Sequence, residues 1–231
     1  THRPCRADGG RDVGMSVPAR LHVLTALHSS VAVVLRRGPT GHVASIGWDR
    51  KTGHISDAHW LRGRIYEYRA DLSPDGRHMV YFAGKGGRFW TALSRAPRLT
   101  AIYFAPQSDA WGGGGGFDAD GRFWTGVGTP ADLPDGLIGA PPSALPWSTD
   151  GLWGGTYLAK LVLRGWSHDS GLAYGARLSR LVAKGWRLEQ GFVTGGANRA
   201  ITSSTYALRR SDGSAVIEQP DWEWADVWKT R

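Results

Sequence analysis

The sequence is almost without cysteine, and this scarcity limits how the fold can be stabilised. Cys5 is the single cysteine among 231 residues. One cysteine can form neither an intramolecular disulfide nor a cluster of thiolate metal ligands. The stability of this chain must therefore come from packing and hydrogen bonds.

Long apolar segments are also missing from the chain. The sequence contains no run of 18 or more apolar residues, the length that a bilayer-spanning helix requires. Residues 1–20 are polar and rich in Gly and Arg, unlike a secretory signal. We therefore expect a cytoplasmic protein with no membrane partner. We expect residues 1–14, which precede Met15, to be a disordered or extraneous extension, and residues 15–231 to form a single domain.

Glycine and tryptophan, in contrast, are abundant, with 33 and 12 residues respectively. Turn formers and large flat side chains favour strands and tight turns over long helices. Short β-branched and aromatic runs recur along the chain, such as Val31–Leu35 and His42–Trp48, and turn residues such as 49–53 separate them. This is the pattern of β-hairpins, and it predicts an all-β fold.

A turn motif makes the expected fold more specific. Ser73-Pro74-Asp75-Gly76 leads into the alternating apolar run that ends at Ala83. Pro fixes one turn dihedral and Gly accepts a positive φ before the strand resumes. This segment resembles the repeat of TolB-type and WD40-like β-propellers, in which the turn joins two strands of one blade. The resemblance implies a fold and carries no catalytic residues.

Further turns follow at 118–121, 167–171 and 210–214. The turn glycines at positions 76, 121, 171 and 213 are separated by 45, 50 and 42 residues. WD40-type repeats run about 40 to 45 residues, and the successive intervals fit this period approximately. The sequence therefore predicts a β-propeller-like array of antiparallel hairpins, open or incomplete. Residues 221–231 are expected to form a blade strand.

Two segments interrupt or blur this repeat. The five prolines within about 126–156 leave few regular strands there, so we expect a Pro/Gly-rich insertion. The segment 158–166 is echoed by 178–186, which suits two adjacent strands of one sheet. Leu158, Leu161 and Val162 also fit helical spacing, so a short helix stays an alternative.

Signatures of catalysis, cofactors and metals are missing from the sequence. Gly-x-Ser-x-Gly is absent, and the contiguous Ser167-His168-Asp169 is interpreted as a polar hairpin turn, because alternation sends neighbours to opposite faces. Gly84–Gly87 lacks the P-loop pattern. Asp118 and Asp120 start like a calcium loop, but the late carboxylate is missing. We predict no catalytic residue, no cofactor and no metal site.

Five residues are the candidate ligand-binding site. The glycine run 112–116 has no side chains, so its backbone could approach a ligand or a neighbouring strand closely. Trp side chains, with Trp48 and Trp60 among them, could form a stacking platform, or could fill the core of blades. The ligand-binding residues predicted from this segment and its neighbours are Trp90, Trp111, Gly113, Gly114 and Trp124.

The net charge of +8 would attract an anionic partner if it were clustered. Arg and Lys are scattered along the chain and reach only doublets, such as Arg36-Arg37 and Arg209-Arg210. A nucleic-acid partner is therefore possible from the net charge but unsupported by any clustered basic patch in the sequence.

Three hypotheses on function follow. The first is a non-enzymatic interaction module that presents a loop-rich face to another protein. The second is a carbohydrate-active or other hydrolase with carboxylates in a Trp-lined funnel, for which Glu67, Asp71 and Asp75 are candidates. Ion pairs with Arg62, Arg64 and Arg69 are the simpler explanation for those three acids. The third hypothesis is binding of an anionic polymer, which requires affinity to fall with salt.

Overall fold

The computed structural model describes residues 19–38, 41–126, 130, 132–140, 155–169, 175–183, 185–194 and 202–227. It is all-β, with 54% strand, which confirms the predicted fold class. The expected extension over 1–14 and most of the expected insertion over 126–156 lie outside these ranges. Within them, no helix has both the length and the apolar character that spanning a membrane requires.

The first sheet is an antiparallel meander in chain order. Its strands are β1 (Arg20–Thr25), β2 (Val31–Arg37), β3 (His42–Asp49) and β4 (Ile55–Arg62). The apolar side chains of β2 alternate with strand period, so Val33 and Leu35 reach the core while the outer face stays partly exposed. The expected turn at 49–53 is confirmed, because β3 and β4 pair as antiparallel strands on either side of it.

The second sheet contains the turn motif. Its strands are β5 (Arg64–Ile65), β6 (Asp71–Leu72), β7 (His78–Lys85), β8 (Arg88–Arg95) and β9 (Ala101–Gln107), and a short 3-10 helix, η1 (Glu67–Arg69), precedes β6. The Ser73–Gly76 turn joins β6 to β7, as predicted. The Asp75 carboxylate accepts hydrogen bonds from the Ser73 hydroxyl at 2.6 Å and the Arg77 amide at 3.0 Å. Gly76 has φ +82°, which a side chain rarely adopts.

A small hairpin packs on the far face of the second sheet. It contains β10 (Gly115–Phe117) and β11 (Phe123–Thr125), joined by the expected turn at 118–121. Phe117 and Phe123 bury their rings against Val80 and Leu93 of the second sheet. A second 3-10 helix, η2 (Pro134–Gly136), follows, and its Asp135 carboxylate binds Arg95 at 2.6 and 2.7 Å.

The last part of the chain corrects three predictions. Residues 158–163 lie in the helix α1 (Gly155–Leu163), so the interpretation of 158–166 as a strand is wrong and the helical alternative is right. Ser167–Asp169 is strand β12, not a turn, because these residues pair with Ser179–Arg177 of the next strand. Residues 221–227 form no strand.

The third sheet runs in chain order like the first. After β12 come β13 (Gly175–Ala183), β14 (Trp186–Thr194), β15 (Thr202–Arg210) and β16 (Val216–Gln219). The predicted turn at 210–214 joins β15 to β16. One face of the sheet packs on α1 and on the residues that follow it, with Tyr157 of α1 and the later Trp166 against Leu178, Leu188 and Phe192.

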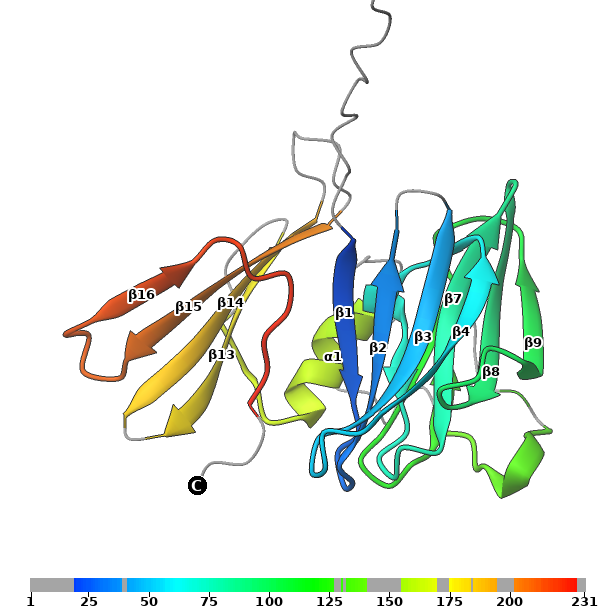
Figure 1. Cartoon of the computed structure of the whole chain (residues 1–231), viewed down its shortest axis with the longest axis horizontal. Coiled ribbons are helices and arrows are strands. Elements are labelled where there is room, and N and C mark those ends of the chain that lie inside the picture. Colours follow the sequence, from blue (N-terminus) through cyan, green and yellow to red (C-terminus); the bar gives the residue numbers. More distant parts are fainter. Residues whose placement is uncertain are drawn as a thin grey trace, which may run out of the picture.

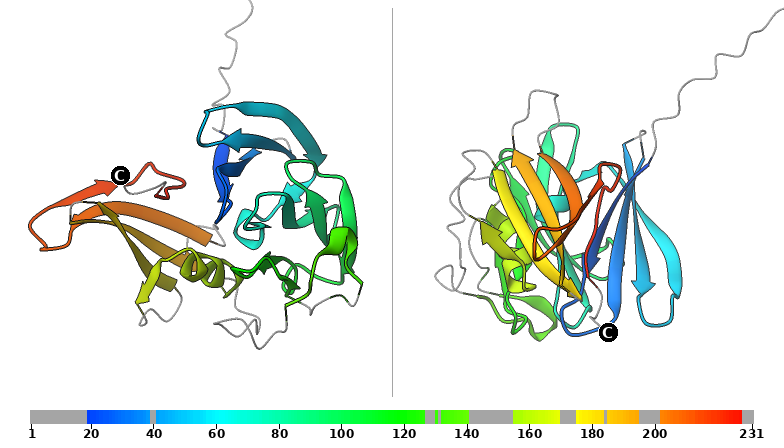
Figure 2. Two further views of the ribbon diagram at one scale, coloured as in Figure 1. Left: turned by 90° about the horizontal axis from the view of Figure 1, so that it is seen from below. Right: turned by 90° about the vertical axis from the view of Figure 1, so that its left-hand side faces the viewer.

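The sheets follow one another in chain order around a common centre (Figure 1 and Figure 2). The first and second sheets pack face to face through Val33, Val43, Leu72, Met79 and Tyr81. No closed propeller or barrel is formed by the residues described, which is compatible with the expected open or incomplete array. The segment 220–227 returns from the third sheet to β1, where the Leu21 amide donates to the Glu223 carboxylate at 2.7 Å.

Candidate functional site: a basic cleft between the first and third sheets

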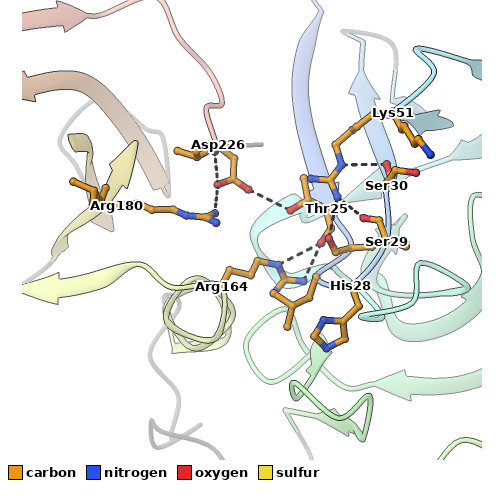
Figure 3. Close-up of a pocket in the computed structure, with 13 residues that line it drawn as sticks. Thr25, His28, Ser29, Ser30, Lys51, Arg164, Arg180 and Asp226 are labelled. Atoms are coloured by element: carbon orange, nitrogen blue, oxygen red, sulfur yellow. Dashed lines mark hydrogen bonds and ion pairs between the residues drawn. The ribbon is translucent and has the colours of Figure 1, made fainter. Parts of the chain in front are cut away.

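A cleft of about 450 Å³ opens where the first sheet, α1, the third sheet and the segment 220–227 meet (Figure 3). Its size falls within the range of small-molecule sites. Four cationic side chains and one carboxylate contribute to the wall. The lining residues with polar side chains are Thr25, His28, Ser29, Ser30, Arg50, Lys51, Arg164, Arg180 and Asp226.

The β1–β2 loop is shaped by Arg50, which follows β3. The Arg50 guanidinium donates to the carbonyl oxygens of Ala26 at 2.9 Å, Ser29 at 2.8 Å and Ser30 at 3.2 Å. Burial lowers the pKa of Arg50 to about 10, the attraction of Asp226 raises it, and the positive charge of Arg164 lowers it further. The cation therefore organises the loop and adds positive charge to the cleft at neutral pH.

Arg164 stands just beyond the last residue of α1 and joins that helix to the second sheet. Its guanidinium forms an ion pair with Asp71 at 2.7 Å and also donates to the carbonyl oxygens of Thr25 and Leu72. The Asp71 carboxylate accepts a further hydrogen bond from the Phe117 amide at 3.0 Å. Both side chains are largely buried, at 12% and 3% exposure, so this pair fixes one wall of the cleft.

Arg180 and Asp226 close the opposite wall. Arg180 of β13 forms an ion pair with Asp226 at 2.7 Å, and the Thr25 hydroxyl donates to the same carboxylate at 3.3 Å. Asp226 therefore links the third sheet to the first (Figure 3). Lys51 lies in the β3–β4 turn on the rim of the cleft and is exposed.

A smaller cavity of about 30 Å³ shares Thr25, Arg164 and Asp226 with the cleft, and its volume suffices for one water. Lys160 of α1 lines it and donates to the Ala70 carbonyl. Burial lowers the pKa of Lys160 to about 8, while the Asp71 charge raises it. Burial, and secondarily the Lys160 charge, also lowers the pKa of His22 to about 3.

The arrangement suits an anion more than a metal ion. Among its lining side chains the cleft has four cations against one acid, a formal charge of +3. Guanidinium groups are forked donors that match carboxylate and phosphate oxygens. In contrast, the described residues contain no group of three or more His, Cys, Asp or Glu side chains that could hold a metal.

The five predicted ligand-binding residues lie away from this cleft. Trp124 is buried at 1% exposure, Trp90 stacks on Phe104, and Trp111 is 60% exposed beyond β9. The Gly113 and Gly114 backbones instead pack against the second sheet. A Cβ at Gly113 would lie 2.0 Å from the Phe82 ring, and one at Gly114 would lie 2.8 Å from the backbone of Arg69. The structure thus places these two glycines in close packing against β7 and η1.

The three candidate carboxylates are all engaged in ion pairs. Their partners differ from Arg62, Arg64 and Arg69, the ones expected from the sequence. The observed pairs are Glu67 with Arg37 at 3.5 Å, Asp71 with Arg164 at 2.7 Å, and Asp75 with Arg77 at 2.7 Å.

Sequence reasoning missed the residues of the cleft. Arg50 lies in the predicted turn at 49–53, and Arg164 and Arg180 lie in the echoed segments 158–166 and 178–186, but none of the three was predicted to be a site residue. More than 100 residues separate Arg50 from Arg164. The doublets singled out at 36–37 and 209–210 do not line the cleft. Only the fold brings these three arginines together.

Known proteins offer little comparison for this chain. No family model matches it, and no curated protein matches it. A solved structure of hydrazine synthase from Kuenenia stuttgartiensis is similar with a TM-score of 0.36 and 11% identity, over 94% of this chain and 70% of that chain. A similarity at this level carries no argument about the function of this chain.

Proposed function

We propose that this chain is a non-enzymatic, propeller-like binding module whose ligand is a small anion held in the basic cleft. The observation that carries the proposal is the convergence of Arg50, Lys51, Arg164 and Arg180 from separate elements on one cleft of about 450 Å³. Inorganic phosphate alone would leave most of this volume empty. A phosphorylated or polycarboxylate molecule fits it better.

Two features support the propeller-like description: the first and third sheets contain strands that pair in the order of the sequence, and the Ser73–Gly76 turn joins two paired strands. The first sheet is a four-stranded meander, as a propeller blade is. The turn joins β6 to β7 as it does in the TolB-type and WD40-like repeats that it resembles. Membership of that family stays a prediction.

The hydrolase hypothesis has less support than binding does. A retaining or inverting glycosidase needs a general acid and a second carboxylate free to act on the substrate. Asp71 is bound to Arg164, and Asp226, which also borders the smaller cavity, is bound to Arg180. A protein partner, as first expected from the sequence, stays a separate prediction.

Titration calorimetry with pyrophosphate and with citrate tests the proposal. Either probe should give a saturable signal, and Lys51→Gln and Arg180→Gln should each weaken binding. The loss of one charge-assisted contact corresponds to about 1.5 to 3 kcal/mol, or roughly 10- to 100-fold in affinity.

Arg177→Gln is the matched control. Arg177 is an exposed arginine on the same strand as Arg180, and it is not part of the cleft. Its substitution changes the net charge equally and should leave affinity unchanged. Equal losses for Arg177→Gln and Arg180→Gln, or the absence of saturable binding to both probes, would contradict the proposal.

A further inference from the structure

A row of cations lies at the end of the first two sheets that is opposite to the cleft. We propose that this row binds the phosphodiester backbone of a nucleic acid. We call it the cationic rim, and its members are Arg20, Arg36, Arg37, Arg62, Arg64, Lys85 and Arg88. The cleft is built at the β1–β2 loop and the β3–β4 turn, whereas the rim lies where β1 begins and where β2 and β4 end (Figure 1).

Strand register places the members of the rim side by side. Arg20 is the direct cross-strand partner of Arg37, and His42, at the start of β3, is the partner of Arg62. The row continues into the second sheet, where Lys85 is the partner of Arg88.

The two sheets meet closely enough to make the rim continuous. The Gly63 amide donates to the Gly41 carbonyl at 2.7 Å, which joins the end of β4 to the start of β3. A Cβ at Gly63 would lie 2.8 Å from the Gly84 carbonyl and 3.4 Å from the Cβ of Lys85. Arg64, the next residue, pairs with Gly84. The cations therefore lie together at the ends of six strands, β1, β2, β4, β5, β7 and β8.

The charge of the rim is largely uncompensated within the described residues. Arg20, Arg36, Arg62, Lys85 and Arg88 are exposed and take part in no ion pair there. Arg64 lies 4.5 Å above the Tyr66 ring. Among the described residues, the rim forms one ion pair, which joins Arg37 to Glu67 at 3.5 Å.

Such an arrangement works against the stability of the fold. Like charges directly opposite each other on neighbouring strands are destabilising, as Arg20 with Arg37 and Lys85 with Arg88 are. An anionic polymer would relieve this repulsion, because each phosphate neutralises part of the row. A partner that only binds the folded surface would therefore also stabilise the protein.

The chemistry favours phosphate over an acidic protein segment. Six of the seven members are arginines, whose planar guanidinium matches phosphate oxygens with two hydrogen bonds. Neighbouring strands lie about 4.8 Å apart, so the cations form a line that an extended backbone can follow. In contrast, the core of a protein interface is depleted in charged residues.

Fluorescence anisotropy with a labelled oligouridylate of about 20 nucleotides, longer than the site of one small binding domain, tests the proposal. For single strands, the slope of log affinity against log salt concentration is about −0.7 per phosphate contacted. With about five phosphates contacted, affinity should therefore fall about 100-fold from about 50 to about 200 mM salt. The variant Arg20→Gln/Arg62→Gln/Arg64→Gln should bind about 100-fold more weakly at about 0.1 M salt, with a slope shallower by about 2.

The control variant is Arg98→Gln/Arg177→Gln/Arg187→Gln, which removes three exposed arginines outside the rim and has the same net charge. It should bind like the unsubstituted protein. Equal weakening of both triple variants would show attraction by net charge alone and overturn the proposal. Salt-independent or absent binding would overturn it too, as would competition by polyglutamate as effective as that by unlabelled RNA. Circular dichroism of each variant confirms that it is folded.

Discussion

The buried ion pair between Asp71 and Arg164 makes a sharp prediction about stability. Asp71→Asn keeps the size of the side chain and removes its charge, so the Arg164 guanidinium loses its partner while it stays buried. Breaking a buried pair from one side costs about 3 to 5 kcal/mol. The same carboxylate accepts the Phe117 amide through its other oxygen, and because asparagine has a single acceptor oxygen it can satisfy only one of these two donors.

Urea unfolding at about pH 7 measures this cost as a change in the free energy of unfolding. Asp120→Asn is the matched control, since Asp120 is 74% exposed and lies 3.5 Å from Arg122. An exposed pair contributes about 0 to 1 kcal/mol. Arg164→Leu combined with Asp71→Asn should recover part of the loss, because no buried charge is left unpaired. A cost for Asp71→Asn no larger than that for Asp120→Asn would refute the reasoning.

Three further predictions concern single residues. Burial lowers the pKa of His22 to about 3, so the unfolded state binds a proton more readily than the folded state, and stability falls as pH drops below about 6.5. In urea unfolding between about pH 7 and 4.5, the His22→Phe variant should therefore lose about 2 to 3 kcal/mol less stability than the unsubstituted protein. Lys160 has its pKa lowered to about 8, so stability should rise by about 1 kcal/mol from about pH 7 to 9, a gain that Lys160→Met should lack. Gly113→Ala should cost about 1 to 3 kcal/mol in thermal or urea unfolding because its Cβ would meet the Phe82 ring, whereas Gly38→Ala, with open space around it, should be nearly neutral. Unchanged pH profiles in either variant, or equal stability of the two alanine variants, would contradict these explanations.

The hairpins could be predicted because their chemistry is local. The Ser73–Gly76 turn contains its own hydrogen-bond partners and the Gly76 φ within a few residues, so the sequence alone identifies it. The same holds for the turns at 118–121 and 210–214. Register then follows from alternation between a buried and an exposed face.

The segment 158–166 shows where local reasoning failed. Its apolar residues suit both a strand and a helix, and the echo at 178–186 favoured the strand. The helix is selected by tertiary packing instead, since Tyr157 and Leu158 of α1 contact the third sheet, and the buried Lys160 donates to Ala70 of the second. Periodicity within a short segment carries no information about such distant partners.

The cleft and the cationic rim were unpredictable for a related reason. Arginines that look scattered along the chain, such as Arg20, Arg37 and Arg62, gather at one end of the sheets once register is set. Arg50 and Arg180 gather with Arg164 at the other end. Charge clustering is therefore a property of the fold here, and counting neighbours in the sequence underestimates it.

The segment 220–227 has a consequence for the order in which the molecule opens. The hydrogen bonds from Leu21 to Glu223 and from Thr25 to Asp226 span 202 and 201 residues, whereas each hairpin closes over a short loop. Contacts so distant in sequence bear a larger loop-closure entropy. The two ends of the array should therefore separate as a local opening that leaves the sheets folded, and native-state hydrogen exchange should find the Leu21 amide less protected than that of Val33.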